Sequence, residues 1–207
     1  MNAAVLKDAM NHISHIMTEN KDYLIELDQQ NGDGDLGISM SSGYKAVADY
    51  LASTQETDLG KLLMKAASVF NEAAPSSLGT ITSFGMMGMA RVLKGKEEAD
   101  LCEIAQAMKA GVQKIMDKAG SKQGEKTILD ALCPGVDALL SNCEKGNAQA
   151  AFQAAVQAAK EGSESTRQMR SVHGRAAYYG DKSIGMLDGG SVVGKLIFEA
   201  LYEYSCI

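Results

Sequence analysis

The sequence predicts an all-α protein. It contains two prolines, 12 methionines and no tryptophan, and aromatic residues make up only 5% of the 207 residues. Alanine and methionine favour helices, whereas strand-forming residues are scarce. Helical spacing of apolar residues recurs along the chain, and no segment alternates apolar and polar residues as a half-buried strand does. We therefore expect one domain, residues 1–207, with about eight helices packed as an antiparallel bundle or closed barrel.

The first helical region leads into an acidic loop. Apolar residues at helical spacing predict either one helix or two helices broken near Asn20. These residues are Met10, Ile13, Met17, Leu24 and Leu27. The pattern resumes after Gly37, and either Ser39 or the loop before it is expected to cap the new helix. The acidic residues between these patterns are therefore expected at a helix–loop–helix junction.

The remaining helices follow in order. One helix ends before Pro75, because the residue before a proline is disfavoured in a helix, and another runs from about residue 78 to about residue 95. A helix over residues 100–119 is stopped by Gly120. Residues 124–143, 147–169 and 191–205 give three further helical segments. Residues 171–190 contain five glycines and no steady period, and a loop of this length in a compact domain is usually functional or disordered.

Charge and cysteine content exclude several classes of protein. The formal net charge is -6, without a run of five basic residues, so the chain should not attract nucleic acid or anionic membranes. No run of 18 apolar residues and no signal-peptide core occur, which predicts a cytoplasmic protein with no membrane attachment. The cysteines lack a C-x-x-C pair and are expected to be reduced thiols: Cys102, Cys133, Cys143 and Cys206.

The acidic loop is the first candidate for chemistry. Asp28, Asp33 and Asp35 lie within eight positions and repel one another unless a cation sits among them. A solvated acidic loop is the alternative. A calcium loop of the EF-hand kind is excluded, because Leu36 occupies the position of its glycine and Ser42 that of its glutamate. Magnesium fits better, since it uses few carboxylates and completes its shell with water and phosphate oxygens.

Three other segments could supply groups for phosphate. Helix-start amides, hydroxyls or cations are offered by Ser76, Ser77 and Thr80, by Gly124, Lys126 and Thr127, and by Arg175. Taken singly, each segment is more simply a helix cap or a loop. The chain has no P-loop sequence, no protein-kinase signature and no nucleophile elbow, so a nucleotide site would be of another design.

Four segments together resemble the nucleotide-binding L subunit of the dihydroxyacetone kinases. They are LDQQNGDGDLGISMSSG from Leu27, SSLGT from Ser76, GEKTILDAL from Gly124 and GRAAYYGDKSIGMLDGG from Gly174. In that family the first usually runs L-D-x-x-x-G-D-x-D-H-G-x-N-M, the third G-D-K-T-M-x-D and the fourth G-R-A-S-Y-x-G-E-R-S-x-G-x-x-D-P-G. The segments follow the family order at comparable spacings across nearly the whole chain.

The resemblance implies an eight-helix antiparallel barrel that holds ADP or ATP and two magnesium ions at one end. Asp28, Asp33 and Asp35 would bind the metal ions. Arg175 would approach the phosphates, and we assign it the catalytic role. The other residues implied around the nucleotide are Leu36, Gly37, Ser39, Pro75, Ser76, Ser77, Gly124, Ile128, Asp188, Gly189 and Gly190.

Members of this family transfer a phosphoryl group to dihydroxyacetone or a related short ketose, which is held on a separate K subunit or domain. The resemblance therefore implies a K-type partner, and a homodimer is a further option. The donor is either ATP or a phosphorylated transport-system protein of the M type that recharges bound ADP. Phosphoryl transfer depends on metal charge and positioning, so two chains can share the task.

The sequence departs from the family pattern at three positions. Leu36 replaces the histidine after the third aspartate, Ser39 replaces an asparagine and Gly189 replaces a proline. These changes indicate a divergent paralogue and leave two alternatives to a kinase subunit. One is a non-catalytic module that binds a transcription factor or a kinase subunit, and the other is a metal-dependent phosphatase or hydrolase.

Overall fold

The computed structural model describes residues 1–206 and is built from α-helices, with no β-strand in this part of the chain. The all-α prediction is confirmed. The first predicted helical region is two helices, separated at Asn20. The helices are α1 (Ala3–Glu19), α2 (Lys21–Asp28), α3 (Leu36–Ser53), α4 (Leu59–Ala73), α5 (Ser77–Leu93), α6 (Leu101–Ala119), α7 (Leu129–Asn142), α8 (Ala148–Ser165) and α9 (Gly189–Ser205).

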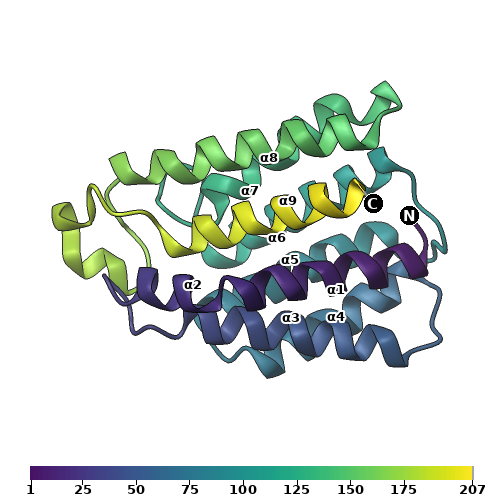
Figure 1. The fold of residues 1–207 in the computed structure, drawn as a ribbon, viewed down its shortest axis with the longest axis horizontal. Helices are drawn as coiled ribbons and strands as arrows, with labels where there is room; N and C mark the ends of the chain where they lie inside the picture. Colours follow the sequence, from purple (N-terminus) through teal and green to yellow (C-terminus); the bar gives the residue numbers. More distant parts are fainter. Residues whose placement is uncertain (207) are drawn as a thin grey trace.

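The helices run alternately up and down and close into a barrel (Figure 1). From α3 onward each helix packs on the next, α1 packs on α3, and α9 returns to pack on α1. Because α2 continues α1 along one side, α1 and α2 together occupy one position in the barrel wall. The helices α1–α9 therefore form a wall of eight positions. The predicted eight-helix antiparallel barrel is therefore confirmed.

The helix ends follow from local sequence. The side chains of Asp58, Ser76 and Asp188 accept hydrogen bonds from the first-turn amides of α4, α5 and α9. Gly120 ends α6 in the left-handed conformation, as its position predicts. At α3 the residue in the cap position is Asp35, whose side chain makes no capping hydrogen bond. Its carboxylate is left for another partner.

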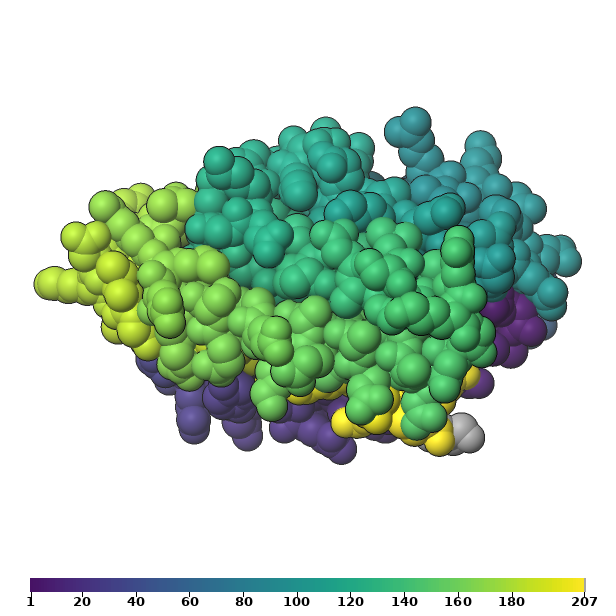
Figure 2. Space-filling model, turned by 90° about the horizontal axis from the view of Figure 1, so that it is seen from above, coloured from purple at the N-terminus to yellow at the C-terminus, as the bar shows by residue number. Residues whose placement is uncertain are grey.

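The two ends of the barrel differ. The acidic loop and residues 166–188 lie at one end, where the latter extend beyond the helices, and both termini lie toward the other (Figures 1 and 2). Residues 166–188 contain two 3₁₀ segments, Thr166–Gln168 and Arg175–Ser183. Within residues 1–206, no helix has both the length and the apolar character that a bilayer span requires.

One expectation about the cysteines is wrong. Cys102, at the start of α6, and Cys143, just after α7, form a disulfide, whereas four reduced thiols were expected. Forty-one positions separate the two residues, and only the packing of α6 beside α7 brings them together. Cys133 is a buried thiol and Cys206 an exposed one.

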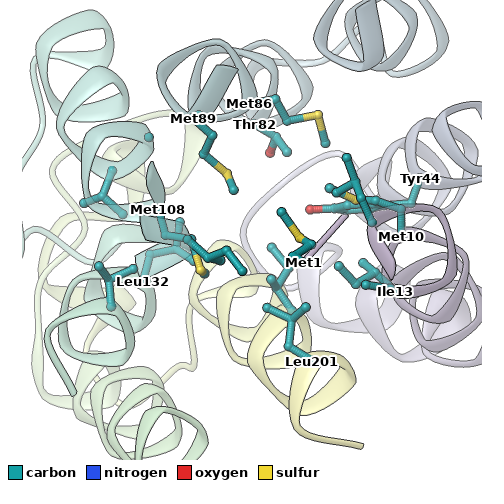
Figure 3. A pocket seen from close by; sticks show the side chains of 18 of the residues that line it. Met1, Met10, Ile13, Tyr44, Thr82, Met86, Met89, Met108, Leu132 and Leu201 are labelled. Atoms are coloured by element: carbon teal, nitrogen blue, oxygen red, sulfur yellow. The ribbon is translucent and has the colours of Figure 1, made fainter. Parts of the chain in front are cut away.

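The interior of the barrel is apolar. Phe70 and Phe198 are fully buried, and the ring of Tyr44 packs edge-on against Phe70 with 4.9 Å between centroids. A cavity of about 200 Å³ remains between the helices, and methionine side chains such as Met10, Met86 and Met108 line it (Figure 3). Flexible methionines fill irregular space of this kind. The core thus supports the barrel along its length.

Candidate functional site

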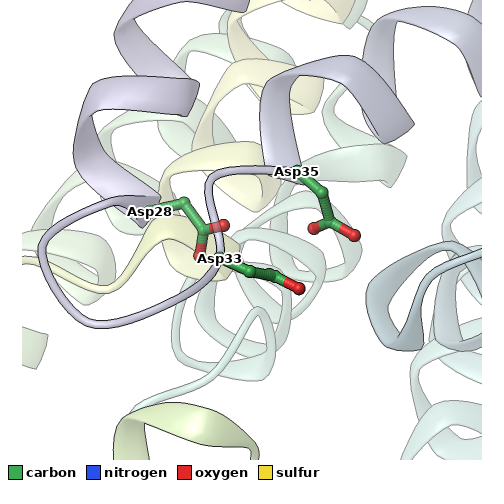
Figure 4. Close-up of side chains that lie close together, drawn as sticks. All are labelled: Asp28, Asp33 and Asp35. Atoms are coloured by element: carbon green, nitrogen blue, oxygen red, sulfur yellow. The ribbon is translucent and has the colours of Figure 1, made fainter.

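Three carboxylates converge in the loop between α2 and α3 (Figure 4). One carboxylate oxygen from each of Asp28, Asp33 and Asp35 lies within 4.8 Å of the others. The Gly34 amide, in a left-handed turn, donates to Asp28 Oδ2 at 2.8 Å. A Cβ on Gly32 would lie 2.2 Å from Asp28 Oδ1 and 2.9 Å from the Asp28 carbonyl oxygen, so a side chain there would displace the Asp28 carboxylate. The two glycines thus let the loop fold around the aspartate cluster.

The electrostatics of this cluster favour a bound cation. Burial, followed by the charges of Asp33 and Asp28, raises the pKa of the Asp35 carboxyl above its ordinary value, while Arg175 lowers it. Arg175 Nη2 lies 2.7 Å from Asp33 Oδ2, and this ion pair is partly exposed. One guanidinium offsets only part of the charge of three carboxylates. A hard divalent cation, with its preference for carboxylate oxygens, fits this donor set.

The aspartates line a cavity of about 750 Å³ at this end of the barrel. The up-and-down order of the helices places four helix N-termini around it, because α3, α5, α7 and α9 all begin here. Leu36, Ser77, Ile128 and Gly189 mark these starts in the cavity wall. Helix N-termini carry partial positive charge and free amide donors, which attract phosphate groups. The cavity therefore combines ligands for a cation with helix starts suited to an anion.

The segment before α7 forms a tight turn in the cavity wall. Both oxygens of the buried Asp130 carboxylate accept amide hydrogen bonds, one from Gly124 and one from Thr127 at 2.7 Å. Lys126, within this turn, donates to three backbone carbonyls and not to another side chain. The sequence suggested Lys126 as a cation for phosphate, but its ammonium group organises the protein backbone.

Asp188 lies in the cavity wall beside this turn. Its Oδ2 accepts a hydrogen bond of 2.7 Å from the Ser191 amide and caps α9. Burial raises the pKa of the Asp188 carboxyl to about 7, although the Ser191 amide and the charge of Lys126 oppose the increase. The side chain can therefore change its charge near neutral pH.

Most of the residues selected from the sequence surround this one cavity. Those that line it are Asp28, Asp33, Asp35, Leu36, Pro75, Ser76, Ser77, Ile128, Arg175, Asp188, Gly189 and Gly190. Gly37, Ser39 and Gly124 lie outside the lining. Gly37 is packed against the backbone of α2, where a Cβ would lie 2.1 Å from the Lys21 carbonyl oxygen, and Ser39 is buried inside α3. Gly124 is exposed and bonded to Asp130.

Sequence reasoning missed part of the cavity wall. Ile115 and Ala119 come from the last turns of α6, and Ser121 follows them. Their only signal was the position of Gly120, which ends a helix that must point at this end of the barrel. His173 also lines the cavity, and its Nε2 lies 2.7 Å from Glu125 Oε2. No pattern in the sequence connected these two residues.

Two departures from the family pattern are neighbours in space. Leu36 is 7% exposed, and a Cβ on Gly189 would lie 2.5 Å from its Cδ2 atom. Glycine at position 189 leaves the room that the leucine occupies. The two differences are therefore parts of one change in packing between the starts of α3 and α9.

Comparison with known proteins assigns the family. The model of the DAK2 domain matches residues 30–203, which is most of the chain. The chain belongs to the DAK2 domain family. This family assignment agrees with the resemblance seen in the sequence.

The DAK2 domain protein is similar over its length to several characterised relatives. It is 27% identical over 205 residues to the PEP-dependent dihydroxyacetone kinase 2, ADP-binding subunit DhaL, of Listeria innocua, covering 98% of this chain and 95% of the relative. It is 31% identical over 196 residues to the L-erythrulose kinase of Pectobacterium atrosepticum, covering 93% of this chain but 33% of that enzyme. The chain thus spans about a third of the longer relative.

A solved structure has the same fold as the DAK2 domain protein. The dihydroxyacetone kinase from C. freundii, crystallised in complex with AMP-PNP and Mg²⁺, superposes with a TM-score of 0.78 at 23% sequence identity. The match covers 98% of this chain and 34% of that one.

Proposed function

We propose that the DAK2 domain protein is the nucleotide- and magnesium-binding subunit of a short-ketose kinase. One observation carries the proposal: a cluster of three carboxylates lies in a cavity bounded by the starts of four helices. A cation bound to the carboxylates and phosphates bound at the helix starts would neutralise each other. The relative that matches almost end to end is named an ADP-binding subunit, which supports the same assignment.

Different residues of the cavity would bind the metal ions, bind the phosphates and stabilise the transferred group. Asp28, Asp33 and Asp35 would hold two magnesium ions, which neutralise charge on the phosphates when bound. The caps of α5 and α9 use the amides of Gly79 and Ser191. The amides that precede these two in each helix would bind phosphate oxygens of ADP or ATP. Arg175, at the cavity rim, supplies the positive charge that we assign to catalysis. Leu36 has no hydrogen-bonding group, so the metal and the backbone carry more of the phosphate binding.

The acceptor would be a short ketose held on a separate K-type subunit that docks at this end of the barrel. Two kinase relatives are named for L-erythrulose, and others are named for dihydroxyacetone. The relatives named PEP-dependent favour a phosphorylated M-type transport-system protein that recharges bound ADP. On this view the protein transfers phosphate only together with its partner subunit.

Calorimetry of ADP binding tests the assignment. With magnesium present we expect ADP to bind, and Asp33→Asn to weaken the affinity by about 100-fold or more, because a metal ligand is lost. Chelation of the metal should have the same effect. Asp49→Asn, an exposed aspartate on α3 paired with Lys45, is the matched control and should bind normally. Unchanged ADP binding by Asp33→Asn would overturn the proposal.

Activity needs a second assay. The protein should transfer phosphate when a K-type subunit, a short ketose and a phosphoryl donor are supplied. Nucleotide binding without transfer under these conditions would instead identify a non-catalytic regulatory module. Native mass spectrometry of the purified protein should show bound nucleotide with two metal ions.

A further inference from the structure

Lys126 occupies an unusual position at the edge of the cavity. Its side chain is 3% exposed, although lysine is rarely buried. It is also the one residue other than glycine with a positive φ, at 60°, among residues 1–206. Such backbone is unfavourable for a side chain and persists only where the surroundings enforce it. The two Asp130 hydrogen bonds to the same turn provide that enforcement.

The ammonium group of Lys126 joins both ends of one chain segment. Its Nζ atom donates to the carbonyl oxygens of Met169 at 3.2 Å, Ser183 at 2.6 Å and Met186 at 2.7 Å. An ammonium group has three hydrogens, so all of its donors are used. Met169 begins the segment 169–186, and the other two residues end it. Lys126 therefore closes the neck of a loop that lies 43 to 60 positions away in sequence.

The loop 169–186 carries Arg175 to the cavity. Its outer part has few buried contacts: Tyr178 is 92% exposed, and this region extends beyond the helices in Figure 2. Besides the neck, the loop is held by the His173–Glu125 contact and by the Arg175–Asp33 ion pair. The Gly185 amide also donates to the Arg167 carbonyl oxygen at 2.7 Å, next to the neck. The buried neck is thus the fixed point from which Arg175 reaches Asp33.

We propose that Lys126 is a positioning residue, which closes the neck of the loop 169–186 and so holds Arg175 at the phosphate end of the cavity. The role assigned to Arg175 rests on the proposed function. Lys126 acts through Arg175 and not on the phosphates, because its three hydrogens are bonded to protein carbonyls. The contact between His173 and Glu125 holds the outer part of the loop and does not involve the residues of the neck.

Hydrogen exchange tests the neck without nucleotide. Lys126→Met keeps an unbranched side chain that is one heavy atom shorter and removes its donors, which leaves the carbonyls unsatisfied. We expect amides of residues 170–184 to exchange about tenfold faster or more, while those of α4 and α5 are unchanged. Lys122→Met, an exposed lysine in the same turn, should leave exchange as in the wild type. Unchanged protection in Lys126→Met would overturn the proposal.

A double-mutant cycle tests the action through Arg175. In the otherwise wild-type protein, Lys126→Met should weaken ADP binding in magnesium by about tenfold, but by less than about twofold when Arg175 is already alanine. An equal effect in both backgrounds would overturn the proposal. A wild-type protein that binds no ADP would contradict the proposed function instead, and the exchange experiment would still decide whether Lys126 closes the neck.

A second variant tests the neck even if Lys126→Met fails to fold. The Ser183 hydroxyl donates to the Gly180 carbonyl at 2.6 Å and accepts from the Ser171 amide at 2.9 Å, so it braces the same neck from the loop side. Ser183→Ala leaves Lys126 in place and should loosen residues 170–184 in the same way. Its effect on ADP affinity should also shrink in the Arg175→Ala background. If a folded Ser183→Ala protein shows neither effect, the proposal that the neck positions Arg175 is wrong.

Discussion

Asp188 combines a structural contact with an unfavourable charge. Its carboxyl caps α9 through the Ser191 amide, yet burial raises its pKa from 3.8 to about 7. Between these two values the native protein binds more protons at this site than the unfolded chain does. The associated stability is therefore complete below pH 4 and is lost as the pH rises through about 7.

The variant Asp188→Asn tests this linkage. Asparagine is also a good helix cap, so α9 should persist, but the side chain no longer ionises. Without metal or nucleotide, the melting temperature of the wild type should fall from pH 5 to pH 8 by roughly 5–10 °C more than that of the variant. If the melting temperatures of the wild type and the variant change equally between pH 5 and pH 8, the carboxyl does not titrate in this range.

Individual residues differ in how far the sequence predicted their roles. The aspartates of the acidic loop could be selected because three like charges within eight positions need a common partner. Lys126 could not be assigned, because its three acceptors are backbone carbonyls of distant residues. Backbone acceptors leave no trace in side-chain patterns. Short-range charge clusters are thus readable from sequence, whereas long-range backbone contacts are not.

At the scale of the elements, the sequence predicted where helices begin and end. It did not predict all of the helices that meet at the cavity. Pro75 and Gly120 mark helix ends by their own backbone preferences, and both agree with the structure. The approach of α6 to the site depends on packing between helices. Ile115, at helical spacing with other apolar residues, could be assigned to the core but not to the rim of a cavity.

The contact of α7 with α8 gives a prediction at this scale. Gly162 of α8 packs so closely on α7 that a Cβ would lie 2.0 Å from the Asp130 carbonyl oxygen. Backbone cannot move aside as a side-chain end can. Gly162→Ala should therefore push the helices apart and lower the free energy of unfolding by about 1–3 kcal/mol, despite the higher helix propensity of alanine. Chemical denaturation measures the difference.

The neighbouring exposed position provides the control for this helix. Lys160→Ala should change the unfolding free energy by less than about 0.5 kcal/mol. Because Asp130 fixes the turn that contains Lys126, Gly162→Ala should also loosen the loop 169–186. A Gly162→Ala protein as stable as the wild type would mean that α8 can shift without cost.

At the scale of the whole molecule, the polar cavity at one end of the barrel is distinct from the apolar core between the helices. The cavity with its aspartates lies at one end, and an apolar core with a cavity of about 200 Å³ lies between the helices. The disulfide joins the start of α6 to the residue after α7, and both of these ends point away from the site. A barrel of packed helices should keep changes at the disulfide from reaching the site.

This separation predicts stability without an effect on binding. A disulfide that closes a chain of 41 residues contributes about 4 kcal/mol through the entropy of the unfolded chain. Cys102→Ser should therefore lower the melting temperature by roughly 10 °C relative to the oxidised wild type, and reduction of the wild type should do the same. Cys206→Ser, which removes an exposed free thiol, should change little. In all three cases magnesium-dependent ADP affinity at the other end should stay within about twofold of the wild type. An affinity that falls together with the melting temperature would show that the two ends of the barrel are coupled.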